Sequence, residues 1–176
     1  MQTRLYSIIL LGIASSMGCG GISFDVKLDS ETIVERGTLI EQLLPVVFDS
    51  FIAIDLTETQ EFKNEQVGRD RVKSVLLSSF AIEVTHPPDE SDLSFLRSLE
   101  FFVEADDLAQ ERIAYSDEDA FSQGVRRVDL QLDDVELQPF VVADHFSVTS
   151  KVSASRRPPV DTTIRGEIVF RVKAGL

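Results

Sequence analysis

The sequence has a single cysteine, no tryptophan and only two histidines among its 176 residues. One cysteine excludes an intramolecular disulfide, so a hydrophobic core must supply the stability of the fold. Neither His86 nor His145 has a second histidine at metal-ligand spacing, which argues against a zinc site. His145 follows Asp144, which could orient it as a general base, but no nucleophile motif accompanies the pair. We therefore predict no catalytic residue.

Long apolar runs are also missing. The one apolar segment near the start, Leu5 to Ala14, follows Arg4 and precedes the small residues around Ser16. A positive charge, an apolar stretch and small residues are the three parts of a secretory signal peptide. Ten helical residues rise only about 15 Å, roughly half the hydrocarbon thickness of a bilayer. We predict that residues 1–18 are a signal peptide and that the chain has no transmembrane anchor.

Gly18-Cys19-Gly20 follows the apolar run directly. This segment resembles the cleavage region of bacterial lipoproteins, and the resemblance implies that Cys19 is acylated and becomes the first residue of the mature chain. Ser16 and Met17 stand where that family usually has Leu and a small residue. Ordinary cleavage after Gly18 is the alternative, since Ser16-Met17-Gly18 also fits the small-x-small pattern, and it would leave Cys19 as a free thiol. An unpaired thiol in an exported protein needs an explanation, and acylation provides one.

The location follows from the same segment. Two acyl chains are enough for stable anchoring, so lipidated Cys19 would hold the protein at a membrane surface in the cell envelope. Gly20, in place of an Asp retention signal, resembles the outer-membrane sorting pattern of some bacteria. Residues 19–21 would then be the lipidated cysteine with a short linker, and residues 22–176 have the length of one domain.

Basic residues are scarce relative to acidic ones. The chain has 17 Lys and Arg against 30 Asp and Glu, a formal net charge of −13, and loss of Arg4 makes the mature chain one unit more negative. So acidic a surface disfavours nucleic acid or anionic lipid as the main partner. With 43% hydrophobic residues, the composition is that of a globular protein.

Several segments alternate between apolar and polar residues with a period of two, as strands that bury one face do. The strands predicted in this way lie at 22–28, 72–84, 99–105, 113–115, 128–132, 146–154 and 160–174. Apolar residues occupy both parities of 72–84, which predicts a strand covered on both faces. The segment 128–132 is predicted as one strand that ends in a bulge or turn at Asp133-Asp134. Residues 58–66 are predicted as a short surface helix with Phe62 as its one large anchor.

These strands, with few helices and no alternation of strand and helix, predict an all-β fold. The expected architecture is an antiparallel β-sandwich of the immunoglobulin-like kind, although the Cys and Trp hallmarks of true immunoglobulin domains are missing.

Carboxylates gather at Asp117, Glu118 and Asp119. They could bind Ca²⁺ through their oxygens, helped by Asp106 and Asp107 across a turn, although the spacing is not that of an EF-hand. A solvated loop in a strongly acidic protein explains the cluster equally well. No other cofactor is predicted.

Phe102 and Val169 interrupt otherwise polar strand faces. If both are exposed together, they would form an apolar patch of the kind that marks a partner surface. The alternative, which we favour, is a second layer of core beneath a loop or helix.

The leading hypothesis is a non-enzymatic, lipid-anchored β-sandwich of a bacterial envelope that binds a protein partner or supports an assembly at the membrane surface. A module that binds Ca²⁺ or carbohydrate at the acidic loops is the alternative, and a hydrolase comes third.

Overall fold

The computed structural model describes residues 21–37, 51–117, 119–143 and 145–175. Its strands are β1 (Ile22–Val34), β2 (Val72–His86), β3 (Leu96–Ala105), β4 (Glu111–Tyr115), β5 (Arg127–Asp129), β6 (Gln131–Leu132), β7 (Phe146–Ala154) and β8 (Thr162–Ala174). Its helical turns are η3 (Leu56–Glu58), α1 (Gln60–Glu65), η4 (Arg69–Arg71) and α2 (Gln138–Val141).

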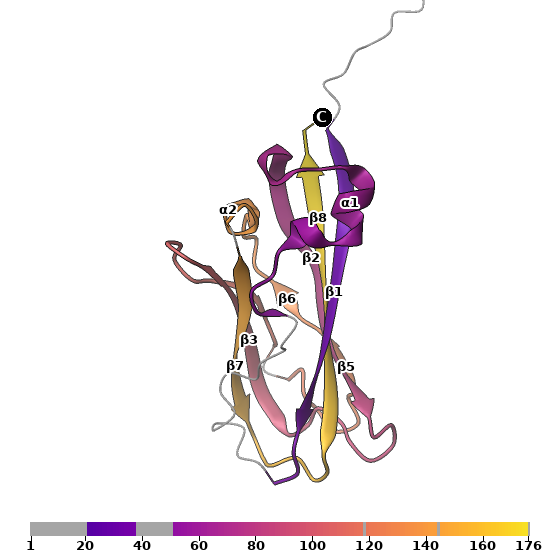
Figure 1. Ribbon diagram of the computed structural model, residues 1–176. Helices are drawn as coiled ribbons and strands as arrows, with labels where there is room; N and C mark the ends of the chain where they lie inside the picture. The colour runs from indigo at the N-terminus through magenta and orange to yellow at the C-terminus, as the bar shows by residue number, and fades with distance from the viewer. Residues whose placement is uncertain (1–20, 38–50, 118, 144, 176) are drawn as a thin grey trace, which may run out of the picture.

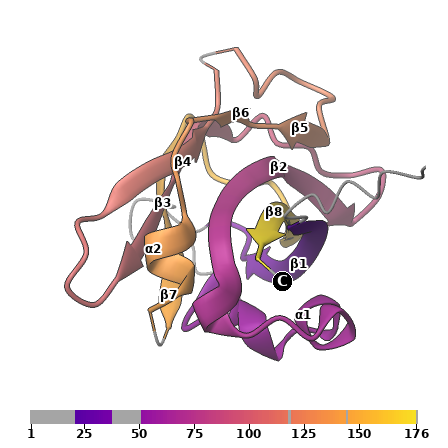
Figure 2. The same cartoon turned by 90° about the horizontal axis from the view of Figure 1, so that it is seen from above.

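The strands form two four-stranded antiparallel sheets, ordered β1-β8-β2-β5 and β6-β4-β3-β7, which we call sheet A and sheet B (Figure 1). Seen from above, β3, β4 and β7 lie on one side of β2 and β1 and β8 on the other (Figure 2). The predicted all-β sandwich is confirmed. Its immunoglobulin-like character stays a prediction.

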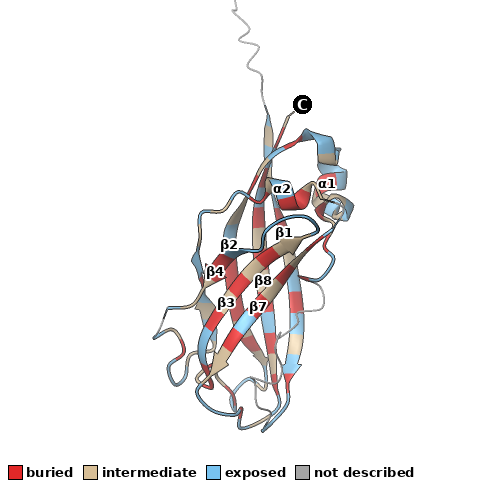
Figure 3. Ribbon diagram, turned by 90° about the vertical axis from the view of Figure 1, so that its left-hand side faces the viewer, coloured by how far each residue is buried: buried red, intermediate tan, exposed pale blue. Residues whose placement is uncertain are grey.

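The strand with the strictest alternation, β8, lies between β1 and β2 and pairs with both along its length. Its inward residues are buried and its outward residues are exposed or half-buried, which is the pattern read from the sequence (Figure 3). At about 3.3 Å per residue, its 13 residues span about 43 Å.

The prediction that β2 is covered on both faces holds at Phe80, Ala81 and Ile82, which are consecutive and all buried, but the register adds a second cause of the apolar pattern. The register of β2 against β8 shifts at three places, between Val72 and Ser74, Leu77 and Ser79, and Val84 and His86. Each extra residue moves the following side chains to the other face of the strand. Bulges therefore also explain why apolar residues occupy both parities, and they bend β2 visibly (Figure 2).

The predicted single strand at 128–132 is in fact two strands, β5 and β6, which belong to different sheets. The chain crosses from sheet A to sheet B at Leu130, whose side chain is buried and whose N–H donates to Phe80 O at 2.9 Å. The predicted turn at Asp133-Asp134 follows the end of β6, where Val135 N donates to Asp133 O at 3.0 Å, but the chain changes sheet earlier, at Leu130. The sequence pattern did not show this change of sheet, because Leu130 is apolar and continues the alternation of the residues before and after it.

Side chains from both sheets form one hydrophobic core. Aromatic rings join the sheets at its centre, where Phe80 of sheet A meets Phe101 of sheet B with ring centroids 4.1 Å apart. Both rings are almost completely buried.

Sheet A is longer than sheet B, and its upper part in Figure 1 rises above β3 and β7. We call the end where β1 and β2 begin and β8 ends the upper end, and the opposite end of sheet A the lower end. The predicted helix is α1, which lies against β1 at the upper end (Figure 1). Its anchor Phe62 is 1% exposed and meets Phe24 edge to face at 5.1 Å between ring centroids.

Candidate functional site

The predicted lipidation residue, Cys19, lies outside the described residues, and the structure begins two positions later at Gly21. Strand β1 starts at the next residue, Ile22, which pairs with Ala174 near the end of β8. A Cβ atom at Gly21 would stand 2.7 Å from the carbonyl oxygen of Ala174, so only glycine fits this approach without a shift of the backbone. The segment that carries Cys19 therefore joins the fold at the upper end of sheet A.

The predicted calcium ligands do not come together with their proposed helpers. Asp117 and Asp119 are exposed in the loop after β4, and Glu118 lies outside the described residues. Asp106 and Asp107 lie in the turn between β3 and β4, so the whole of β4 separates them from the loop. The expectation that they help across a turn is wrong, because an antiparallel strand carries its two flanking loops to opposite ends. Within the described ranges, no three His, Cys, Asp or Glu residues gather in a way that could hold a metal ion.

The two histidines are exposed and far apart in the fold. His86 ends β2, and His145 directly precedes β7. Asp144, the expected orienting partner of His145, lies outside the described residues. His145 instead has an electrostatic influence on Asp55.

Phe102 and Val169 cannot form one patch. Phe102 belongs to β3 in sheet B and Val169 to β8 in sheet A, and both are half-buried on the outer faces of their sheets. A cation covers one of the two, since Lys151 Nζ lies 4.4 Å from the ring centroid of Phe102. The shared patch is therefore excluded. The Phe102 ring is covered by a lysine side chain and not by the helix or loop that the favoured alternative predicted.

The lower end carries a polar cleft of about 360 Å³ between the loops that follow β2, precede β5 and precede β8. We call it the lower cleft, and its lining residues are Pro88, Asp89, Glu90, Ser91, Asp92, Gly124, Arg126, Arg156 and Pro159. Arg126 Nη2 donates to Val84 O at 2.9 Å, and Arg156 Nη2 donates to the Ser94 hydroxyl. Both arginines thus fasten loops to the sandwich while they line the cleft.

Asp92 connects two of the loops around the lower cleft. Its Oδ1 accepts hydrogen bonds from the N–H and hydroxyl of Ser94, and its Oδ2 accepts from Gly124 N at 2.8 Å. Partial burial alone would raise the pKa of Asp92. The hydrogen bonds from Ser94 and Gly124, with the nearby charge of Arg156, outweigh this effect and hold the pKa below its ordinary value. Ionised Asp92 therefore stabilises the shape of the cleft.

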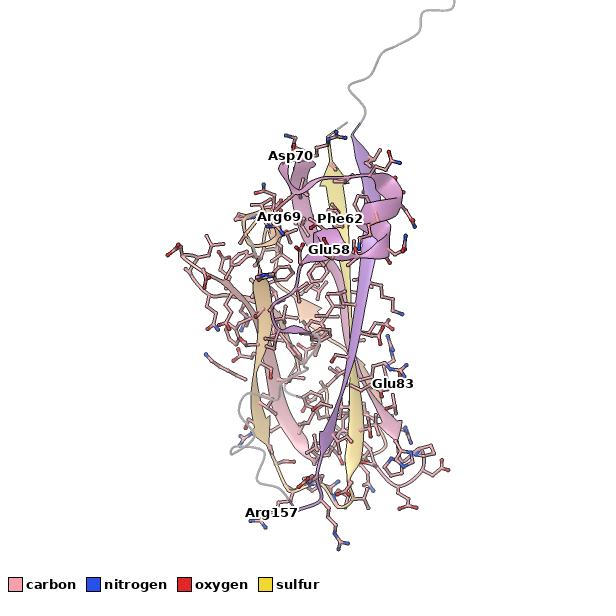
Figure 4. The ribbon with its side chains drawn as sticks, viewed as in Figure 1. Glu58, Phe62, Arg69, Asp70, Glu83 and Arg157 are labelled. Carbon is pink, nitrogen blue, oxygen red and sulfur yellow. The ribbon has the colours of Figure 1, made fainter. Side chains whose placement is uncertain are left out.

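The same local arrangement occurs at Asp55. Its Oδ1 accepts from the N–H of Thr57 at 2.9 Å and from the Thr57 hydroxyl at 2.6 Å, and its Oδ2 pairs with Arg69 at 2.7 Å. Here too, burial would raise the pKa of Asp55, but hydrogen bonds and the Arg69 charge lower it. The pair joins the start of η3 to Arg69 of η4, which is labelled in Figure 4.

Glu136 accepts hydrogen bonds from the edge of β2 in the part of the strand that does not pair with β5. Its Oε1 accepts from Val75 N at 2.7 Å and its Oε2 from the Ser74 hydroxyl at 2.7 Å, while Leu137 N donates to Val75 O. Burial opposes ionisation, but these hydrogen bonds and the charge of Lys173 lower the pKa of Glu136. A side chain thus replaces a missing neighbouring strand.

These three carboxylates predict a loss of stability in acid. A carboxylate whose folded pKa lies below its unfolded value of about 4 stabilises the fold above that value. This contribution is lost as the pH falls through the folded pKa. We expect Asp92→Asn to lower the free energy of unfolding by about 1–3 kcal/mol at pH 7 and by less in acid, where Asp92 itself is protonated. Urea titrations at neutral and acidic pH measure this.

The matched control is Asp89→Asn, which removes the same charge from an exposed position of the same loop. We expect it to change stability by less than about 0.5 kcal/mol at either pH. Equal effects of the two substitutions would contradict the conclusion that Asp92 holds two loops together.

These three hydrogen-bonded carboxylates were not identified from the sequence, although two of them lie in the same short sequence pattern. Asp55-Leu56-Thr57 and Asp92-Leu93-Ser94 share the pattern Asp-Leu-Thr/Ser. In both, the aspartate accepts from the hydroxyl residue two positions on, and the intervening leucine is fully buried. This is the spacing of an Asx turn, which a search for turn chemistry would have found. Glu136 also accepts from an N–H two positions on, that of Gln138, but its partners on β2 lie 61 and 62 positions away and leave no local signal.

No described helix is both long and apolar enough to cross a membrane. No protein-family model matches the chain, and no curated protein matches it. A structure titled Turnip yellow mosaic virus is similar over 99% of this chain and 91% of its own, at 10% identity and a TM-score of 0.36. One titled Desmodium yellow mottle tymovirus covers 100% and 93% of the two chains, at 11% identity and a TM-score of 0.27. Similarities this low carry no argument about this protein.

Proposed function

We propose that the protein is a lipid-anchored cell-envelope protein, held by acylated Cys19 at the outer membrane, that acts as a non-enzymatic binding or structural module. The observation that carries this proposal is the position of the one cysteine, between an apolar signal-like segment and a strand that begins three residues later. With two intervening residues, three steps along the chain give a tether of at most about 11 Å between Cys19 and Ile22. The sandwich would therefore stand close to the bilayer.

With so short a tether, the two ends of the sandwich would have different roles. The upper end would face the bilayer, because β1 begins there. The lower end, with the lower cleft and the loops around it, would stand about 43 Å away, the length of β8. We propose that the lower end is where a protein partner binds.

The carboxylates with shifted pKa values hold the fold together, and none of them has the shift that a general acid needs. Every described Asp or Glu with a shifted pKa has it lowered, and each has hydrogen-bonding or cationic partners that explain the shift. A general acid needs the opposite shift, which keeps its proton near neutral pH.

Capture of partners from detergent-solubilised envelopes tests the proposed binding end. Arg157 is exposed at the lower end (Figure 4), and we expect Arg157→Glu to weaken capture of a partner that the unaltered protein recovers reproducibly. Lys63→Glu is the matched control, since it reverses one exposed charge on α1 at the upper end. Recovery of no reproducible partner, or equal losses from both variants, would contradict the proposal. A calcium- or glycan-dependent melting shift would instead favour the ligand-binding alternative.

A further inference from the structure

The upper end of this acidic protein collects cations from three separate segments. Arg71 ends η4, Lys73 follows it in β2, and Lys173 lies near the end of β8. Pairing brings them together, because Gly175 N donates to Arg71 O at 2.9 Å and Ser74 lies opposite Lys173. The Lys73 side chain also reaches Gly175, since its Cε lies 3.2 Å from where a Cβ would stand there. We call Arg71, Lys73 and Lys173 the basic end cluster.

These three cations differ from those farther down sheet A. There, Arg171 pairs with Asp25, Lys27 with Glu167 and Arg165 with Glu31. Within the described part of the chain, no carboxylate oxygen lies within 4.0 Å of the charged nitrogens of the basic end cluster, although Lys173 acts on Glu136 at longer range. All three residues are exposed.

The cluster surrounds the point where the chain enters the fold. Ile22 and Val72 both lie opposite Ala174, one on each side of β8, and Lys173 lies opposite Ser23. Neighbouring strands are about 4.8 Å apart, so the cluster lies within about 10–15 Å of Gly21. The one acidic residue of η4, Asp70, has its Oδ1 close to Gly68, 2.6 Å from where a Cβ would stand there.

We propose that the basic end cluster binds the headgroups of anionic phospholipids and so orients the sandwich with its upper end on the bilayer. This inference rests on the proposed acylation of Cys19, which would bring the cluster to the membrane surface. Attraction between basic residues and an anionic surface acts within a Debye length, about 8 Å at physiological salt. Carboxylates of η3, α1 and η4 also lie at the upper end and are repelled by the same surface, so this orientation requires the cluster to lie closer to the headgroups than they do.

The lysines themselves provide the readout. The acylated full-length mature protein is placed in vesicles of phosphatidylcholine alone or of phosphatidylcholine mixed with phosphatidylglycerol, and the amine-labelling rate of each lysine is measured by mass spectrometry. We expect Lys73 and Lys173 to react about fivefold more slowly in the anionic vesicles, the effect of about one basic residue's attraction to such a surface. Lys27 and Lys151 are the internal controls, because both are exposed outside the cluster. High salt should remove the difference.

A pair of substitutions isolates the contribution of the cluster. Arg71→Gln removes one of its charges and leaves both lysines for the readout, so labelling of Lys73 and Lys173 in anionic vesicles should become faster. Arg97→Gln removes an equally exposed charge from the start of β3 and should leave these rates unchanged.

Two results would overturn the inference in distinguishable ways. An acylated protein in which Lys73 and Lys173 respond to anionic lipid no more than Lys27 and Lys151 would contradict the orientation and leave the proposed anchor intact. A mature protein without acyl groups, recognised by its intact mass, would overturn the proposed anchor and this inference with it.

Discussion

Phe101→Ala should lower the free energy of unfolding by about 3–5 kcal/mol, the usual effect of truncating a buried phenylalanine. Phe101 is fully buried, and its ring stacks on Phe80 across the two sheets. The substitution removes one of the contacts between the sheets and leaves a cavity between them. Natural domains are stable by only about 5–15 kcal/mol, so this one change removes a large part of the total. Chemical denaturation followed by circular dichroism measures it.

The adjacent residue provides the control. Phe102→Ala removes the same ring from the outer face of sheet B, where Phe102 is half-buried and Lys151 lies over its ring. Cation–π contacts at exposed sites contribute about 0.5–1 kcal/mol, and we expect a loss near that size. If Phe101→Ala proves too unstable to purify, Phe101→Leu should give a smaller loss that still exceeds that of Phe102→Ala. Equal losses at the two positions would contradict the assignment of inner and outer faces.

Exchanging residues 1–19 for a signal peptide with an ordinary cleavage site should move the protein from the detergent phase to the aqueous phase. Each buried methylene of an acyl chain contributes about 0.8 kcal/mol to membrane binding, so two chains anchor a protein stably. Without them, the domain is strongly acidic and has no acyl chain to hold it in detergent. Partition between detergent and water after extraction of the envelope measures this change.

The unaltered protein should enter the detergent phase in the same experiment. A variant with Gln2→Ala, changed only within the predicted signal peptide, is the control and should partition with it. An unaltered protein found mainly in the aqueous phase would contradict anchoring. So would an exchanged protein that stays in the detergent phase, because its retention would then come from the sandwich.

The sequence predicted the strands well where one face of each is buried and the other is solvated. β3, β7 and β8 lie close to where alternation placed them, and β1 begins where it was predicted but runs on to Val34, because the period of two follows directly from the backbone of a strand. Alternation failed at β2 and around Leu130, where bulges and a change of sheet shift the phase. Both depend on which strands become neighbours, and local pattern does not specify this.

Features of the site were harder to predict because they depend on distant contacts. The basic end cluster forms only when β2 and β8 pair, which brings Lys73 and Lys173 together across 100 positions of sequence. The lower cleft likewise needs three loops from separate parts of the chain. The predicted role of Cys19, in contrast, depends on neighbouring residues alone, and the structure adds that β1 begins immediately after them.

The intact mass of the mature protein, purified from the membrane fraction, tests the central claim most directly. Acylation at Cys19 predicts a chain that begins at Cys19 and carries the additional mass of its acyl groups. Fragmentation should place that mass on the first residue. An unmodified chain that begins at or beyond Cys19 would contradict the anchor and, with it, the assignment of the upper end to the membrane.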